Sequence, residues 1–360
     1  MFILQRYIGM SVVRGFFLLA IIVVSLFSII LLIDELDQVG TGSYNWLLAI
    51  KYVLYHTPKL LLDFAAFISL VGSIIALGSL ASNHELVAIE SVGVSPQGVI
   101  NSVLFAALIL MTLVLLNAQF VIPATLQAAH VEKTLAVDGR GDFISEAGYW
   151  AQSEHRFIHI KEVENGRIPI DVEIFEYNDR YELLRYLFAK KVLLINDQSW
   201  QLQDVTVKEV INGELVVKLL KNTQWESFLN TTQLGVIVSK PEALSISNLY
   251  HYVQGLKQRG EQYYRYELLF WQKITAPVSA AIMILLGMPF VFGSQRSVST
   301  GKRITLGVLA GIAFYVITQI VTHVGTLIQW PPLIIALLPA SAVLVILLLI
   351  RWRAKSKLAL

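Results

Sequence analysis

The sequence predicts an α-helical membrane protein with six transmembrane helices and an all-β, jelly-roll-like domain inserted between helices three and four. Four long stretches contain no Asp, Glu, Lys or Arg, namely residues 15–33, 91–131, 274–295 and 304–350. A segment of ordinary soluble composition, from about residue 123 to 266, lies between the second and third of them. Charged residues make up 15% of the chain, against about 25% in soluble domains, because the apolar spans dilute them.

A helix needs about 20 apolar residues to cross the hydrocarbon core of a bilayer. The segments that qualify are 13–33, 59–81, 98–122, 270–292, 304–325 and 332–350. The apolar run after Arg14 is longer than the core of a signal peptide, so we expect it to be retained as a span. The pair Pro331-Pro332 separates the last two spans, since it cannot continue a helix. The predicted domains are 1–122 with three helices, 123–266 with the β-domain, and 267–360 with three helices and a basic tail.

The distribution of basic residues predicts that both termini are cytoplasmic. Arg6 and Arg14 precede the first span, and the chain ends in a basic tail at 351–357. The loop after the first span is acidic, with Asp34, Glu35 and Asp37. Because cytoplasmic loops are enriched in Lys and Arg, the large insert is predicted to face outward, away from the cytoplasm. The 82–97 loop then faces the cytoplasm without any Lys or Arg, which runs against this rule.

The insert has the pattern of antiparallel strands. Segments rich in Val, Ile, Phe and Tyr occur at 156–163, 168–177, 183–195, 200–211 and 214–220. Asn-Gly and Asn-Asp pairs separate them, and such pairs favour tight turns. Short strands at this spacing predict a sandwich or jelly roll. Residues 245–267 then return to a helical pattern.

Two enzyme motifs are incomplete. His84-Glu85 begins like the HExxH helix of zinc proteases, but Ala88 replaces the second histidine. The segment 299–303 resembles the end of a phosphate-binding loop, yet Arg296 and Arg303 stand where that motif needs Gly and Ser or Thr. The chain contains no cysteine, which excludes disulfides and thiolate metal sites. We therefore predict no catalytic residues, no cofactor and no metal site.

A short helix is predicted in the loop 82–93. Ser82 and Glu85 have the spacing of a capping box, which would start this helix, and Gly93 would end it. A separately capped helix at the cytoplasmic surface suits docking into a groove of a partner protein. The alternative is an ordinary interfacial connector, and the pattern alone does not separate the two.

The second span is predicted to begin at Thr57-Pro58, with Thr57 as the N-cap. Lys59 and Asp63 are four residues apart and share one helix face. A charge near the membrane is costly, which favours a functional role, although a snorkelling lysine beside its partner explains the pair equally well. Lys273, Gln319 and His323 are weaker polar candidates inside other spans. Gly307 and Gly311 form a GxxxG motif that permits close approach of another helix.

Motifs along the whole chain carry a resemblance to a known family. They are 6–9 (RYIG), 42–44 (GSY), 57–59 (TPK), 80–87 (LASNHELV), 91–93 (SVG), 243–247 (ALSIS), 292–298 (FGSQRSV), 331–332 (PP) and 337–339 (LLP). On these residues the chain resembles the LptF/LptG family of lipopolysaccharide-export permeases, and its LptG members more than its LptF members. The resemblance implies a heterodimer with an LptF-type permease, driven by a dimeric cytoplasmic LptB-type ATPase. It also implies a periplasmic jelly roll that passes lipopolysaccharide toward LptC and LptA.

The resemblance also implies roles for single residues. Coupling to the ATPase falls on Ser82, Glu85, Leu86, Ile89 and Glu90 of the short helix. A lateral gate between spans one and five, or the packing beside it, falls on Phe27, Ile30, Gly307, Gly311, Phe314 and Gln319. Candidates for contact with the lipid headgroup are Lys59, Asp34, Asp63, Lys133 and Lys273. Leu31 and Asp37-Gln38 depart from the family, in which basic residues are common at these positions, so the headgroup contacts are expected to be redistributed.

The predicted function is that of a permease subunit of an ATP-driven transporter. It would extract lipopolysaccharide from the outer leaflet of the inner membrane and pass it through the β-domain toward the outer membrane. One alternative is a different ABC permease subunit, such as a lipoprotein-type exporter. Others are a membrane-anchored scaffold or receptor and, less well supported, a membrane-anchored hydrolase.

Overall fold

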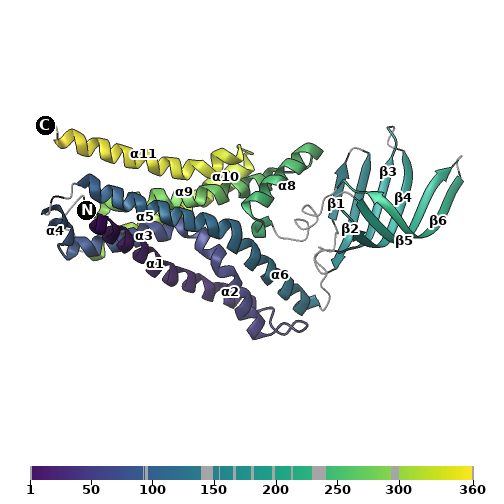
Figure 1. The fold of residues 1–360 in the computed structure, drawn as a ribbon, viewed down its shortest axis with the longest axis horizontal. Helices are drawn as coiled ribbons and strands as arrows, with labels where there is room; N and C mark the ends of the chain where they lie inside the picture. Colours follow the sequence, from purple (N-terminus) through teal and green to yellow (C-terminus); the bar gives the residue numbers. More distant parts are fainter. Residues whose placement is uncertain are drawn as a thin grey trace. The chain divides into compact units, whose positions relative to one another are not determined.

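A computed structural model describes residues 2–91, 93, 96–138, 149–153, 155–164, 168–179, 182–196, 199–211, 214–228, 241–292 and 300–358. The chain folds into two compact units. The helical unit comprises Met1–Leu31, His56–Ile122 and Glu267–Leu360. The mixed unit comprises Leu32–Tyr55 and Pro123–Tyr266, and it contains the β-sheet (Figure 1).

The helices that precede the sheet are α1 Phe2–Leu36, α2 Trp46–Asp63, α3 Ala65–Ser82, α4 Glu85–Ser91, α5 Pro96–Leu116, the π-helical turn η1 Asn117–Val121, and α6 Ile122–Asp138. The helices that follow it are the 3₁₀ turn η2 Pro241–Ala243, α8 Ile246–Arg259, α9 Tyr264–Phe292, α10 Thr300–Leu327 and α11 Pro332–Leu358. Six helical segments are long and apolar enough to cross a membrane: Ile3–Leu36, Ala65–Ser82, Gln97–Val137, Tyr264–Val291, Gly301–Leu327 and Pro332–Ile350. The predicted set of six spans is confirmed.

The predicted start of the second span at Thr57-Pro58 is wrong. Helix α2 begins at Trp46 and runs through Pro58 to Asp63. Asn117 of η1 donates from Nδ2 to the Pro58 carbonyl oxygen at 2.8 Å. This bond ties η1 to α2. The hydrogen bond that Pro58 cannot donate is a different one, to the carbonyl four residues earlier at Leu54. Pro58 therefore lies within a helix instead of opening one.

Helix α3 lies at the centre of the helical unit, where it is the most buried of the candidate spans. A Cβ atom added at Gly72 would lie 2.9 Å from the carbonyl oxygen of Gly15 and 3.0 Å from Cα of Phe16. The backbones of α1 and α3 thus touch directly at this pair of glycines. Close backbone approach through small residues is the usual way for membrane helices to pack tightly.

The GxxxG motif of α10 also faces α3. A Cβ atom at Gly311 would lie 2.6 Å from the ring of Phe67, and one at Gly307 would overlap the side chain of Ile74. The close helix contact predicted from this motif is confirmed, and its partner is α3. Phe314, one turn further on, packs against the cluster that contains Leu70, Ile74 and Met283.

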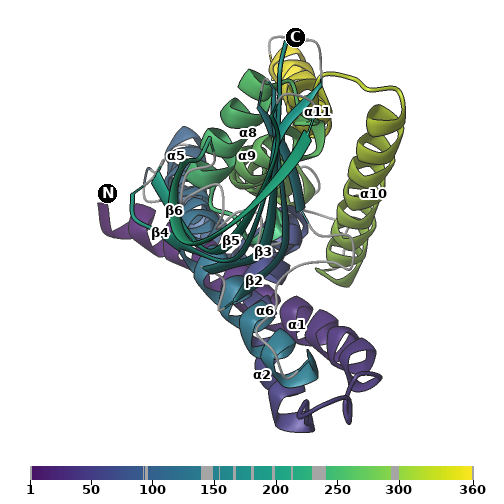
Figure 2. The same cartoon turned by 90° about the vertical axis from the view of Figure 1, so that its right-hand side faces the viewer.

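The strands are β1 Tyr149–Ser153, β2 Arg156–Glu164, β3 Ile168–Tyr177, β4 Leu183–Leu194, β5 Ser199–Ile211 and β6 Glu214–Glu226. They form one antiparallel sheet in the order β1-β2-β3-β4-β5-β6, and the sheet is strongly curved (Figure 2). The inserted β-domain is confirmed. A jelly roll pairs strands out of sequence order, whereas the strands that the structure describes follow one another as a meander. The short strand β1 was not predicted.

The pairing register explains the core of the sheet. Ile158 lies opposite Ile174, Ile174 opposite Leu187, and Leu187 opposite Val207. Since residues directly opposite one another share a face, these four side chains form a continuous apolar row across the sheet. They belong to a buried cluster that also contains Trp200, which is 0% exposed.

Candidate functional site

In the mixed unit, the loop after α1 docks onto the carboxyl end of α6. Gly42 has a φ of +55°, and a Cβ atom there would overlap the backbone of Val137, so this position requires glycine. The next residue, Ser43, donates from its amide nitrogen at 2.6 Å and from Oγ at 3.0 Å to the carbonyl oxygen of Ala136. The last carbonyls of a helix lack partners within the helix. The loop supplies one here and brings Tyr44 against α6.

A buried ion pair lies beside this loop. The carboxylate of Glu35 accepts a hydrogen bond from the Tyr44 hydroxyl at 2.9 Å and forms an ion pair with Lys133 Nζ. The Lys133 ammonium also lies 4.6 Å from the centre of the Tyr52 ring, a cation–π distance. Glu35 is 4% exposed and Tyr44 is 2% exposed. The charge of Lys133, a predicted headgroup contact, is therefore already compensated from within the chain.

The two tyrosines stay protonated over the physiological range. Burial raises the pKa of Tyr44, and its hydrogen bond to the Glu35 carboxylate raises it further. Burial also raises the pKa of Tyr52 to about 12, with the nearby negative charge of Glu35 as the second cause. Tyr44 thus remains a hydrogen-bond donor to Glu35.

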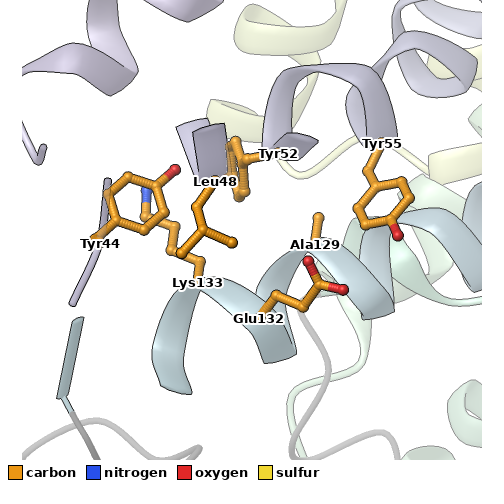
Figure 3. A pocket seen from close by; sticks show the side chains of 7 residues that line it. All are labelled: Tyr44, Leu48, Tyr52, Tyr55, Ala129, Glu132 and Lys133. Carbon is orange, nitrogen blue, oxygen red and sulfur yellow. The ribbon is translucent and has the colours of Figure 1, made fainter. Parts of the chain in front are cut away.

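The pair borders a narrow crevice, which we call the tyrosine crevice. It is lined by Tyr44, Leu48, Tyr52, Tyr55, Ala129, Glu132 and Lys133. The side chain of Lys133 extends toward Tyr44, whereas Glu132 points away from it (Figure 3). Glu132 pairs with Lys51 at 2.6 Å. Lys133 in the crevice and Lys51 beside it therefore each hold a carboxylate partner, and an anionic ligand has to compete with that carboxylate.

The headgroup candidates lie in both units. Lys59 and Asp63 of the helical unit form an ion pair at 2.7 Å, which confirms that they share a helix face. Lys273 of the same unit is buried, at 6% exposure. Asp34 of the mixed unit is exposed, and Lys133 of that unit pairs with Glu35. Sequence reasoning missed Glu35 and its partner Tyr44, although both lie near the quoted 42–44 motif.

The short helix α4 covers Glu85–Ser91, and Gly93 follows with a φ of +92°, as predicted for its end. The predicted capping box is wrong. Ser82 is the last residue of α3, and its hydroxyl donates back to the Ser79 carbonyl oxygen at 3.0 Å. A serine can bond its own helix in this way instead of capping the next one.

The residues predicted to couple to the ATPase occupy different environments. Leu86 and Ile89 are buried, at 1% and 7% exposure, so they anchor α4 to the chain. Ser82 is exposed, and the Glu85 carboxylate accepts a hydrogen bond from Tyr7 Oη at 2.8 Å. The side chain of Glu90 lies outside the described residues.

An aromatic stack connects α1 to α10. The ring of Phe27 on α1 stacks on Phe64 with a centroid distance of 3.9 Å, and Phe64 stacks on Tyr315 of α10 at 5.4 Å. Phe64 lies between α2 and α3. No pattern in the sequence distinguishes Phe64 or Tyr315 from the other apolar residues around them. Of the remaining gate candidates, Ile30 and Gln319 are exposed.

The architecture and the site define a class: a multi-pass membrane protein with an inserted β-domain and paired charges beside its spans. The family model described as "Lipopolysaccharide export system permease LptF/LptG" matches residues 6–353. The chain belongs to this family. It is 32% identical over 355 residues to the lipopolysaccharide export system permease protein LptG of Haemophilus influenzae, covering 98% of both chains. It is also 32% identical over 354 residues to LptG of Escherichia coli K12, again covering 98% of both chains.

The family and the six apolar helices together indicate a multi-pass protein of the inner membrane. They also indicate a transporter subunit and not a catalyst.

Proposed function

We propose that this chain is the LptG-type permease subunit of an ATP-driven transporter of lipopolysaccharide. It would extract the lipid from the outer leaflet of the inner membrane and pass it through the β-domain toward the outer membrane. One observation carries this proposal. The family match runs from residue 6 to 353, so it includes the membrane helices and the inserted β-domain alike.

The energetics of extraction support a partner ATPase. Each methylene that leaves the hydrocarbon core costs about 0.8 kcal/mol, and lipopolysaccharide carries several acyl chains. A passive permease cannot supply this free energy. The phosphate-binding motif near residue 301 lacks its first glycine and its final hydroxyl residue. ATP hydrolysis is therefore assigned to a separate, dimeric LptB-type subunit.

Helix α4 is the proposed docking element for that ATPase. Its buried residues Leu86 and Ile89 fix it to the helical unit, while His84, Ala88 and Ser91 are exposed. The basic residues at both termini support our proposal that α4 is cytoplasmic and the β-domain periplasmic. An LptF-type permease completes the transport path, and LptC and LptA accept the lipid beyond it.

We assign the lateral entry of lipid to the sides of α1 and α10. Phe27 and Tyr315 meet through Phe64 and form an apolar wall suited to acyl chains. Ile30 on α1 is 48% exposed, which leaves an apolar side chain available to a lipid or to the second permease. Gly307 and Gly311 face α3, so they contribute to helix packing and do not line the proposed lipid entry.

Lys59 is the proposed first contact for a lipid A phosphate. Its side chain and that of Asp63 are both more than 30% exposed, so the carboxylate can be exchanged for a phosphate at little cost. Lys133, the other lysine considered for this headgroup, is already paired with Glu35. Its use would require Glu35 to move away.

The composition of the purified complex tests the transporter. We expect the chain to copurify in mild detergent with two copies of an ATPase, one different six-span permease and bound lipopolysaccharide. Repeated isolation of the chain alone, or as a homo-oligomer without an ATPase, would contradict the proposal and favour a scaffold or receptor.

Charge reversal tests docking at α4. Glu85→Lys should impair ATP-coupled export, because it places a cation where we expect a cation of the ATPase to bind. Asp179→Lys is the matched control, since Asp179 is fully exposed in the β-domain, at 101% of its reference area. Normal export by Glu85→Lys would exclude this docking role.

Lipid cross-linking tests Lys59. Lys59→Asp should weaken cross-linking of lipopolysaccharide to neighbouring positions, whereas Lys59→Arg keeps the charge and should retain it. Equal cross-linking in both variants would mean that Lys59 only reaches toward the interface.

A further inference from the structure

A hydrogen bond joins two helices that are far apart in the sequence. Tyr7 on α1 donates from its hydroxyl to Oε2 of Glu85 on α4 at 2.8 Å. Asn83 donates from Nδ2 to the other carboxylate oxygen, Oε1, at 3.3 Å. Both oxygens of Glu85 are therefore held by donors of this chain.

The joint between α3 and α4 makes this bond important for the position of α4. The two helices are connected only by Asn83 and His84. His84 has a φ of +60°, a left-handed conformation that is costly for residues other than glycine. The buried side chains of Leu86 and Ile89 fix one face of α4 to the helical unit. The hydrogen bond from Tyr7 to Glu85 connects α4 to α1.

Helix α1 is in turn held tightly by its neighbours. A Cβ atom at Gly9 would lie 3.4 Å from the Ser102 carbonyl oxygen of α5, and Gly15 touches the backbone of α3 at Gly72. Further along, α1 carries Phe27, which begins the aromatic stack toward α10. Because α1 contacts α5 and α3 close to Tyr7, a displacement of Tyr7 would move α1 relative to these helices.

We propose that Tyr7 is a positioning residue that links movement of α4 to movement of α1 through Glu85. An ionised carboxylate offers about four acceptor sites. Tyr7 and Asn83 use two of them, which leaves acceptor capacity for a cation of the docked ATPase. The Glu85 carboxylate would thus bind the ATPase with one part of its surface and the Tyr7 hydroxyl of α1 with another. This inference rests on the proposed function, because it assigns α4 to the ATPase and α1 to the lipid entry.

The test uses the complete complex in proteoliposomes with Tyr7→Phe. This variant keeps the ring and removes the bond to Glu85. We expect ATP turnover and assembly to be unchanged, and lipopolysaccharide released per ATP to fall by about threefold, the scale of one net hydrogen bond. Glu85→Gln is the complementary variant, since its amide oxygen still accepts from Tyr7 while the charge is lost. It should weaken ATPase binding instead. Tyr263→Phe removes an exposed hydroxyl elsewhere and should change neither quantity.

Two results would overturn the inference: an unchanged release per ATP in Tyr7→Phe, or a loss of assembly as severe as in Glu85→Gln. If the unaltered complex released no lipopolysaccharide, the proposed function would fail by itself. The link is then judged on the isolated chain by amide hydrogen exchange. Faster exchange over residues 85–91 in Tyr7→Phe supports the link, and unchanged exchange refutes it.

Discussion

The ion pairs Lys133–Glu35 and Lys59–Asp63 differ in burial, and this difference indicates which of them stabilises the fold and which can bind a ligand. The side chains of Lys133 and Glu35 are 19% and 6% exposed, and Tyr44 donates a further hydrogen bond to Glu35. The side chains of Lys59 and Asp63 are 33% and 39% exposed. Removing one partner of a buried pair costs about 3–5 kcal/mol, because the other charge is left uncompensated. An exposed pair contributes only about 0.2–1 kcal/mol.

Burial therefore decides what each lysine can do. Lys133 holds α6 to the end of α1, and an incoming phosphate would have to replace a desolvated carboxylate. Lys59 is partly exposed and can change partners at little cost. The comparison predicts that Lys59 of the exposed pair binds the ligand and that the buried pair Lys133–Glu35 stabilises the fold. Five experiments, from the largest expected effect to the smallest, can break or sharpen it.

Glu35→Ala should lower the free energy of unfolding by about 3–5 kcal/mol, because Lys133 then lies buried without a counter-charge. Thermal unfolding of the purified protein in detergent measures this loss. Asp63→Ala is the matched control and should cost less than about 1 kcal/mol. Equal losses in the two variants would show that burial does not distinguish the pairs.

The double variant Glu35→Met with Lys133→Met sharpens the same point. Replacement of a buried ion pair by apolar side chains of similar size is often neutral. We therefore expect the double variant to recover most of the stability that Glu35→Ala loses. If the double variant is as unstable as Glu35→Ala, the destabilisation comes from lost packing and not from the uncompensated charge of Lys133.

Alkaline pH should destabilise the buried region around Tyr52, Glu35 and Lys133. The pKa of Tyr52 is raised to about 12 in the folded protein, against about 10 in an unfolded chain. A raised pKa contributes stability that is fully present below pH 10 and is lost as the pH rises toward 12, on the order of 2 kcal/mol in all. Unfolding temperatures between pH 9 and 12 measure this slope, and Tyr52→Phe should flatten it. An equal slope in that variant would assign the loss to other groups.

Tyr44→Phe should cost about 1.5 kcal/mol, because it removes one hydrogen bond to the buried Glu35 carboxylate and leaves the ion pair in place. Chemical denaturation at neutral pH measures this change. Tyr55→Phe, at the far end of the tyrosine crevice, is the control and should have a smaller effect. A larger loss in Tyr55→Phe would mean that the crevice, and not Glu35, organises this region.

The smallest effect on stability is expected for Asp63→Asn, at less than about 0.5 kcal/mol. Its effect on ligand binding has the opposite sign. With the competing carboxylate neutralised, Lys59 should bind an anionic headgroup about two- to fivefold more tightly, since an exposed pair is worth at most about 1 kcal/mol. Retention of lipopolysaccharide across a salt series measures this gain. Weaker retention would show that Asp63 orients Lys59 for the ligand.

Much of the fold could be predicted from the sequence, because its signals are local. Charge-free runs identify the spans, and alternating apolar residues identify the longer strands. The starts of helices were less reliable. Thr57-Pro58 has the chemistry of a helix start, but α2 begins at Trp46 and continues through it, and Asn117 of η1 bonds to the Pro58 carbonyl. A local rule has no access to a donor that lies 59 residues away.

The candidate site was less predictable, since its partners meet only in the folded chain. Glu35 and Lys133 are ordinary residues at helix ends until the 42–44 loop docks on α6 and buries them. Neither Gly15 nor Gly72 belongs to a GxxxG motif, so the sequence does not predict their contact. By contrast, Lys59 and Asp63 could be paired in advance because they are one helical turn apart.

The bare crossing of Gly15 over Gly72 gives α1 the geometry of a lever. At about 1.5 Å per residue, Tyr7 stands about 12 Å along the axis on one side of this fulcrum and Phe27 about 18 Å on the other. At the crossing itself the two backbones touch without side chains between them. A tilt about this point moves Phe27 about one and a half times as far as Tyr7, and in the opposite direction. Under the link that we propose between α4 and α1, a push at α4 would therefore reach the aromatic stack enlarged and reversed.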